Sequence, residues 1–304
     1  MLYNDWLYQW VENCVKPTVK SRTYEQYKDI IRLRLEAHLG KMTLEEMTPL
    51  VVQQYICSLL INGNLKTGEG LSSNSINLII IVLQNSLKAA YDLGVVDRYE
   101  MDKLNRPRTQ EKQIQCFSCV EQKMIEKVVL SDRRTKMLGI LMCLYTGLRI
   151  GELLALEWSD VNFEKQELYV RKTCYDRVGE RVISSPKTKS SVRIIPIPKQ
   201  IIPALTKLKV TGMCQYVISD HGQYVSIRSY QRSFALLLKK LCIPHRGFHA
   251  LRHTFATRAL ECGMDVRTLA EILGHKNPTV TLNRYAHSLM EHKREMMNRL
   301  GENL

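Results

Sequence analysis

Apolar residues recur every three to four positions along most of the chain, which is the spacing of amphipathic helices. Two such stretches, 6–14 and 23–39, come first. A third begins after an N-cap at Thr48, and a fourth starts at 72–73 and stops at Gly94. The first hundred residues are therefore predicted to form a small bundle of helices.

The helical pattern lapses after Leu104, and no further apolar residue occurs before Ile114. A polar stretch of this kind around a proline predicts an exposed linker at 105–115. The linker divides the chain into a helical domain at 1–104 and a second domain at 116–304. A length of 304 residues suits two domains.

The second domain combines helices with short strands. Ser118 and Glu121 have the spacing of a capping box, which predicts a helix at its start. Further helices are expected at 136–145, 200–209, 228–241, 249–262 and 266–273. Runs rich in β-branched residues predict strands at 167–174, 181–185 and 192–197. The expected fold is mostly α-helical with a small antiparallel sheet.

The net charge of the chain indicates which kinds of molecule it binds. The net charge of +14 and the pI near 9.4 favour a polyanion such as nucleic acid, with an anionic membrane as the alternative. Residues 1–110 hold 13 basic and 12 acidic side chains, so almost all of the excess lies in 111–304. We therefore expect the main basic surface on the second domain.

Composition and cysteine usage indicate the compartment. Hydrophobic residues make up 45% of the chain and charged residues 24%, a balance that supports a packed core. The nine cysteines are scattered and odd in number, and residues 1–10 lack the pattern of a secretory signal. No run of about 18 apolar residues occurs. We expect reduced thiols, a cytoplasmic protein and no membrane segment.

The first candidate for chemistry is Arg149, in T-G-L-R-I-G-E at 146–152. Gly147 ends one helix and another begins near Ile150, so Arg149 lies at a helix start, where a cation opposes the helix dipole. That position suits an arginine that holds an anion together with the helix N–H groups. Glu152, one turn on, is placed to orient the guanidinium; the alternative is a simple surface ion pair.

A second polar group lies in F-H-A-L-R-H-T at 248–254. His249 and Arg252 are three residues apart and share one face of a helix, so both can serve one site. His253 lies four residues after His249, as in zinc proteases, but Ala250 stands where that motif has its glutamate. A zinc site is not expected here.

Another metal hypothesis rests on Cys116 and Cys119, a C-x-x-C pair that Cys242 and His245 would complete as a four-ligand site. No second C-x-x-C follows, and no strand precedes the pair as a redox motif requires. We therefore expect neither a metal ion nor any other cofactor.

Two further residues complete the set: His275 follows a helix that ends at Gly274, and Tyr285 lies ten residues later. With these residues the sequence resembles the tyrosine recombinases, the family of phage and conjugative-transposon integrases. The motifs that carry the resemblance are T-G-L-R-I-G-E at 146–152, S-P-K-T-K-S-S-V-R-I-I-P at 185–196, F-H-A-L-R-H-T-F-A-T at 248–257, L-G-H-K at 273–276 and N-R-Y at 283–285. All five occur in the family's order.

The resemblance implies a fold and a reaction. Residues 1–104 would form a SAM-like domain that binds the core DNA site, and 116–304 an α+β catalytic domain. Enzymes of this family cut and rejoin DNA at specific sites through a 3′-phosphotyrosyl intermediate, so the expected function is integration or excision of a mobile element. Neither ATP nor metal is needed, because the tyrosyl ester retains the energy of the phosphodiester.

The resemblance also implies a role for each catalytic residue. Tyr285 would be the nucleophile, and Arg149, Arg252 and His275 would hold the scissile phosphate. His249 would exchange a proton with the tyrosine oxygen. Lys187 would protonate the departing 5′ oxygen, with Lys189 as a rival for that role. DNA contacts are expected from Lys189, Arg193, Lys20, Lys28 and Arg32.

Two alternatives share this fold: a type IB topoisomerase, which relaxes DNA without choosing a site, and a DNA-binding regulator that has lost activity. The complete catalytic set argues against the regulator. The partners implied are duplex attachment sites, a homotetramer on two sites, and excision and DNA-bending proteins. The stretch 288–304 is expected to form a helix that docks on a neighbouring subunit or folds back on its own domain.

Overall fold

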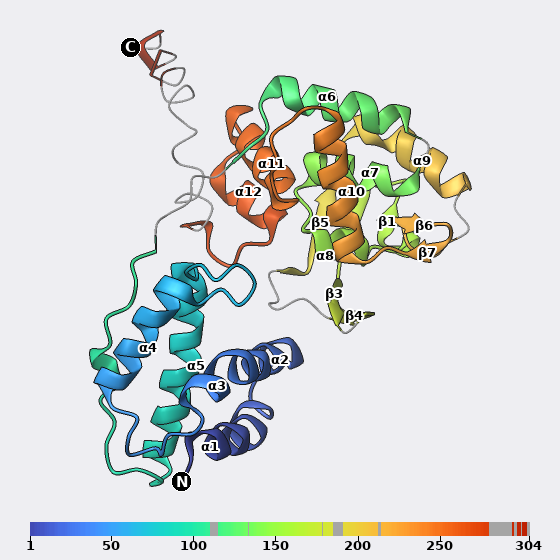
Figure 1. Cartoon of the computed structure of the whole chain (residues 1–304). Coiled ribbons are helices and arrows are strands. Elements are labelled where there is room, and N and C mark those ends of the chain that lie inside the picture. The colour runs from blue at the N-terminus through green and yellow to red at the C-terminus, as the bar shows by residue number, and fades with distance from the viewer. Residues whose placement is uncertain are drawn as a thin grey trace. The chain divides into compact units, whose positions relative to one another are not determined.

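The computed structural model describes most of the chain (Figure 1). The described residues are 1–109, 115–132, 134–177, 179–184, 191–211, 214–279, 294, 297–298 and 300–302. The chain forms two compact units, Met1–Lys112 and Gln113–Leu304. Each unit has its own hydrophobic core, so each is considered by itself below.

The first unit is a helical bundle, as predicted. Its elements are α1 (Tyr3–Trp10), η1 (Val11–Val15), α2 (Ser21–Ile30), η2 (Ile31–Leu35), α3 (Glu36–Leu39), α4 (Pro49–Asn62), α5 (Ser73–Asp92) and η3 (Met101–Lys103). The predicted helices at 6–14 and 23–39 are confirmed, but each contains one π-helical turn, η1 or η2. Apolar periodicity alone does not distinguish a π turn from the α-helix around it.

Side-chain caps fix the two longer helices of this unit. The Thr48 hydroxyl accepts from the N–H of Val51 at the start of α4, and the Ser72 hydroxyl accepts from the N–H of Ser75 at the start of α5. The cap predicted at Thr48 and the helix start predicted at 72–73 are thus confirmed. No described helix combines the length and apolar character needed to cross a membrane.

Nine further helical elements belong to the second unit. They are α6 (Cys119–Ser131), α7 (Thr135–Thr146), α8 (Ile150–Leu154), η4 (Trp158–Asp160), η6 (Lys199–Ile201), α9 (Ile202–Thr211), α10 (Ile227–Lys240), α11 (His249–Glu261) and α12 (Val266–Leu273), counted over the described residues. Ser118 and Glu121 form the predicted capping box of α6. Helix α7 contacts α6, α8, α9 and α11 and is buried over 137–144. It is the central helix of this unit.

The described strands form three small antiparallel sheets where the sequence predicted one. The first has the order β1 (Val161–Asn162), β2 (Glu167–Val170), β5 (Arg193–Pro196); the others are the pairs β3 (Thr173–Arg177) with β4 (Glu180–Ser184) and β6 (Ser219–Asp220) with β7 (Gln223–Tyr224). The predicted strand 167–174 is wrong as a single strand, because Arg171 and Lys172 interrupt it. Their side chains pair with acids on or beside η4, Asp160 at 3.9 Å and Glu157 at 2.8 Å.

Candidate active site

The turn between α7 and α8 carries Arg149. Helix α7 ends at Gly147, which adopts the left-handed conformation (φ 66°), and Arg149 is the N-cap of α8. A Cβ at Gly147 would lie 2.5 Å from Phe255 Cδ1 and 2.8 Å from Leu273 Cδ2. Glycine is therefore needed both for the backbone conformation and for the close approach of α11 and α12. The turn places Arg149 beside these two helices.

Substituting Ala for Gly147 is expected to lower the free energy of unfolding by about 2–4 kcal/mol, from left-handed strain together with overpacking. Gly263→Ala is the matched control, because Gly263 has φ 86° and nothing within 4 Å of its added Cβ. The control should lose only about 1 kcal/mol. Urea unfolding of both variants measures the difference. Equal losses would show that Phe255 and Leu273 move aside freely.

Glu152 is buried one turn into α8 and orients Arg149. Its Oε2 accepts from the backbone N–H of Arg149 at 2.9 Å, and its Oε1 accepts from the Arg149 guanidinium at 2.9 Å. Burial raises the pKa of this carboxyl, but hydrogen bonds and charge from Arg193 and Arg149 outweigh burial and lower the pKa to about 2. Glu152 therefore stays ionised at any working pH.

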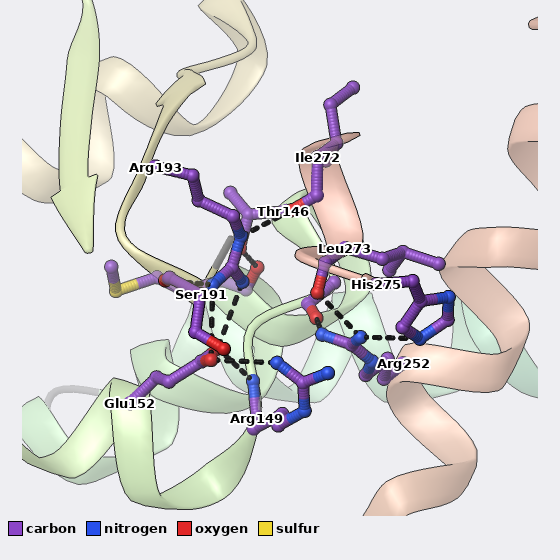
Figure 2. A network of polar contacts seen from close by, with 11 residues as sticks. Thr146, Arg149, Glu152, Ser191, Arg193, Arg252, Ile272, Leu273 and His275 are labelled. Atoms are coloured by element: carbon purple, nitrogen blue, oxygen red, sulfur yellow. Dashed lines mark hydrogen bonds and ion pairs between the residues drawn. The ribbon is translucent and has the colours of Figure 1, made fainter. Parts of the chain in front are cut away.

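Arg193, at the start of β5, is the second partner of Glu152 (Figure 2). Two of its guanidinium nitrogens donate to the two carboxylate oxygens, at 3.0 and 2.9 Å. Its Nε donates to the carbonyl of Ile272 at 2.5 Å, and NH1 also donates to the carbonyl of Ser191 at 3.1 Å. The side chain is 6% exposed. The predicted DNA contact of Arg193 stays a prediction, and these four bonds are what the structure shows of it.

The β3–β4 hairpin lies directly against α8. A Cβ at Gly151 would lie 2.6 Å from the carbonyl oxygen of Cys174, so only glycine allows the strand to pass this close. Arg181 on β4 donates to the carbonyl of Leu154 and lies over the ring of Tyr216 at 4.3 Å. These contacts hold the β3–β4 hairpin, which ends just before 185–190, against α8, which begins just after Arg149.

Arg252 lies buried on α11 between the ends of two other helices. Its guanidinium donates at 2.7 Å to the carbonyl of Gly147, which ends α7, and at 2.7 Å to the carbonyl of Leu273, the last residue of α12. The residue is 2% exposed. Two helix C-termini, each bearing partial negative charge, therefore stabilise this buried cation.

His275 and His249 lie beside and before Arg252. Helix α12 ends at Gly274 (φ 65°), and the next residue, His275, places its Nε2 at 3.0 Å from an Arg252 nitrogen. Since arginine only donates, Nε2 accepts and the proton lies on Nδ1. His249 is the first residue of α11 and is exposed, with its ring edge-on to His253 at 4.6 Å. The structure thus brings Arg252 and His275 together and places His249 one turn earlier on the same helix.

Three predicted residues, Tyr285, Lys187 and Lys189, lie outside the described residues. The DNA contacts predicted for the first unit all lie on or beside α2 and η2. Lys20 is exposed just before α2, and the Lys28 ammonium lies 5.3 Å from the centre of the Tyr24 ring. Arg32 is exposed and pairs with Asp29 at 3.1 Å. The segment from Lys20 through α2 to η2 therefore carries the cations through which the first unit was predicted to bind DNA.

The cysteines of the C-x-x-C pair have ordinary surroundings. Cys116 Sγ lies 3.2 Å from the Thr257 hydroxyl, and Cys119 is exposed. Over the described part of the chain, no three His, Cys, Asp or Glu side chains are grouped to hold a metal ion. The contact of Cys116 links the start of this unit to α11.

The Arg193–Glu152 pair was not predicted from the sequence. A signal was present: Glu152 lies among the apolar residues Ile150, Leu153 and Leu154, and a buried carboxylate requires a cation. The sequence did not show which of many basic residues supplies it, because Arg193 lies 41 positions away.

Comparison with known proteins shows which family the chain belongs to. The family model described as "Phage integrase family" matches residues 113–292, more than half of the chain. The chain belongs to the phage integrase family. The model described as "Phage integrase, N-terminal SAM-like domain" matches residues 2–60 of the first unit. Both the catalytic and the SAM-like parts predicted by the resemblance are confirmed.

Relatives with curated descriptions are recombinases and integrases. A protein described as "Tyrosine recombinase XerC-like" from Caldanaerobacter subterraneus is 30% identical, over 99% of this chain and 82% of its own length. The ICEBs1 integrase of Bacillus subtilis is 25% identical, over 93% of this chain and 78% of its own. The Tn916 transposase of Enterococcus faecalis is 24% identical, over 96% and 76%.

Solved structures confirm the fold. A Tn1549 transposon integrase in complex with transposon right-end DNA aligns with a TM-score of 0.82, covering 99% of this chain and all of that one at 23% identity. A lambda integrase tetramer bound to a Holliday junction aligns with a TM-score of 0.71, covering 92% of this chain and 79% of that one at 19% identity. Both alignments span the two units of this chain.

Family membership settles the class of reaction. Tyrosine recombinases cleave and rejoin DNA strands, and the relatives include integrases and transposases of mobile elements. This chain is accordingly a site-specific tyrosine recombinase. The alternatives of a relaxing topoisomerase and an inactive regulator are not the function that these relatives support.

Proposed function

We propose that the network around Arg149 and Arg252 is the phosphate-binding half of the recombinase active site. The observation that carries the proposal is that Arg252 bonds to Gly147 in the loop that carries Arg149, while His275 contacts Arg252 (Figure 2). Planar guanidinium groups suit the two non-bridging oxygens of a phosphodiester. The buried carboxylate of Glu152 holds the Arg149 fork in one orientation.

Tyr285 supplies the other half of the reaction. Its phenolic oxygen attacks the phosphorus, a bond to the 3′-phosphate forms, and the bond to the 5′ oxygen breaks. His249 takes the phenolic proton, and Lys187 donates a proton to the departing 5′ oxygen. The reverse sequence, with the 5′ hydroxyl of another strand, rejoins the DNA. At each step one phosphodiester bond is exchanged for another, so no energy source is consumed.

The partners follow from this reaction. The substrates are duplex attachment sites, and exchange between two of them uses four copies of the chain, as in the lambda integrase tetramer on a Holliday junction. Accessory excision and DNA-bending proteins would determine whether recombination integrates or excises the element. The Lys20, Lys28 and Arg32 side chains contact DNA from the first unit, and the enzyme works in the cytoplasm where that DNA lies.

The experiment that tests this site uses nicked DNA spanning the junction of the mobile element. Cleavage next to the nick releases a short strand that carries the 5′ hydroxyl. The DNA cannot then be rejoined, so the covalent complex accumulates. We expect one denaturation-resistant adduct, mapped by mass spectrometry to Tyr285, with the same yield in the presence of EDTA because no metal takes part. An adduct on another tyrosine would contradict the assignment. Strand exchange between two duplexes, rather than relaxation of any plasmid, distinguishes recombination from topoisomerase activity.

A further inference from the structure

Arg193 differs from Arg149 in how it meets Glu152. Two guanidinium nitrogens of Arg193 donate parallel hydrogen bonds to the two carboxylate oxygens, and the Arg193 side chain is 6% exposed. Arg149 donates one guanidinium nitrogen to Glu152, and its side chain is 35% exposed. The parallel pair is the stronger arrangement, so Arg193 is the cation that anchors the carboxylate. Arg149 is the one with exposed surface left for a substrate.

Arg193 also reaches the segment that carries His275. Its Nε donates to the carbonyl of Ile272 in the last turn of α12. The next carbonyl, that of Leu273, accepts from Arg252, and His275 follows two residues later. Strand β5 and helix α12 are in contact there. One side chain on β5 therefore bonds both to the carboxylate that orients Arg149 and to the turn that positions His275.

We propose that Arg193 is a positioning residue of the recombinase, which fixes Arg149 through Glu152 and His275 through the end of α12, and that it does not contact DNA. This role replaces the DNA contact that the sequence predicts for Arg193, and it rests on the proposed function of Arg149 and His275. All three donor nitrogens of its guanidinium group are engaged inside the protein. A phosphate contact would require Arg193 to break its ion pair with Glu152, whereas the buried Arg252 bonds to backbone carbonyls and to His275, which leave its charge to be neutralised by a phosphate.

Removing Arg193 has a physical consequence for Arg149. A buried carboxylate that loses its main cation is left under-neutralised, and the Arg149 fork is then drawn onto both of its oxygens. That geometry withdraws Arg149 from the phosphate. Among the described residues, the groups that interact with Glu152 are Arg149 on its own turn, Arg193 on β5 and the buried Cys143 thiol on α7. Without Arg193, burial raises the carboxyl pKa toward the working range.

The test compares Arg193→Met with Arg193→Lys and with the control Arg267→Met. Arg267 lies on α12, is 85% exposed and pairs only loosely with Glu271, at 3.4 Å. For each variant, fluorescence anisotropy gives the affinity for attachment-site DNA at several salt concentrations. Single-turnover cleavage of nicked DNA gives the chemical rate across pH. Circular dichroism checks the fold.

We expect Arg193→Met to cleave about 100-fold more slowly, since misplacing catalytic groups by about 1 Å has an effect of that size. Its DNA affinity should stay within about threefold, and the dependence of affinity on salt should keep its slope, because no phosphate contact is lost. Arg267→Met should cleave within about twofold of the wild type.

Two results would overturn the proposal: cleavage by Arg193→Met at nearly the wild-type rate, or a salt slope lowered by about one unit, the sign of a lost phosphate contact. If the Met variant does not fold, Arg193→Lys decides. An ammonium group cannot replace the fork, so slow cleavage with normal DNA affinity supports positioning, and wild-type cleavage refutes it. Failure of the wild type itself to form an adduct would instead refute the proposed active site.

Discussion

Tyr285→Phe is expected to abolish covalent cleavage, with a fall in rate of at least about 10⁴-fold, as when a covalent nucleophile is removed. The substitution deletes one oxygen and keeps the ring. DNA affinity should therefore remain near that of the wild type, because the arginines that we propose bind the phosphate are untouched. The measurement is single-turnover formation of the adduct on nicked attachment-site DNA, followed by denaturing electrophoresis.

The control for this substitution is Tyr91→Phe, which removes the hydroxyl of an exposed tyrosine on α5 in the first unit. It should leave both adduct formation and DNA affinity unchanged. Persistence of the adduct in Tyr285→Phe would show that another tyrosine is the nucleophile. A loss of DNA binding together with cleavage would show that the Tyr285 hydroxyl serves in binding rather than attack.

Local signals in the sequence were enough to predict the helices. Thr48, Ser72 and Ser118 each cap the helix that their pattern predicts, because a cap acts within three residues of its own position. The left-handed glycines that end α7 and α12 were found for the same reason. The run 167–174 was misread as one strand, since partners of Arg171 and Lys172 some 10 to 15 residues earlier decide where it breaks.

The site was predictable only as a list of residues. The motifs identified Arg149, Glu152, Arg252 and His275, and the structure places them in one network. What the motifs do not contain is the environment of each side chain. Arg252 finds its carbonyl partners 105 and 21 positions away, and such contacts leave no periodic trace in the sequence. The near burial of Arg193 depends on the same long-range packing.

The network also explains how one site can hold a cation firmly and still present others to a substrate. Arg252 is buried against two helix C-termini, whose carbonyls balance its charge. Glu152 balances Arg193 and part of Arg149. Among the described residues this network has three arginines and one carboxylate, an excess of positive charge that suits the phosphodiester we propose it binds.

Arg252→Lys is expected to lower both stability and cleavage. Two separate guanidinium nitrogens reach the carbonyls of Gly147 and Leu273, and one of them also reaches His275, whereas the single nitrogen of a lysine cannot span partners spaced for the planar fork. Leaving one or both carbonyls without a donor should lower the free energy of unfolding by about 2–4 kcal/mol. Loss of one planar phosphate clamp should slow cleavage by about 10²–10³-fold.

Arg258→Lys is the matched control, because Arg258 lies on the same helix and also donates to a backbone carbonyl, that of Phe117, at 3.0 Å. It lies outside the network of Arg149 and His275, so its loss should reduce stability by about 1 kcal/mol and leave cleavage within about twofold. Urea unfolding and single-turnover cleavage are measured on both variants at a temperature where each is folded. If both lose stability and neither loses cleavage, Arg252 is a structural cap and the phosphate is held elsewhere, because a residue that binds the reacting group cannot be replaced without changing the rate.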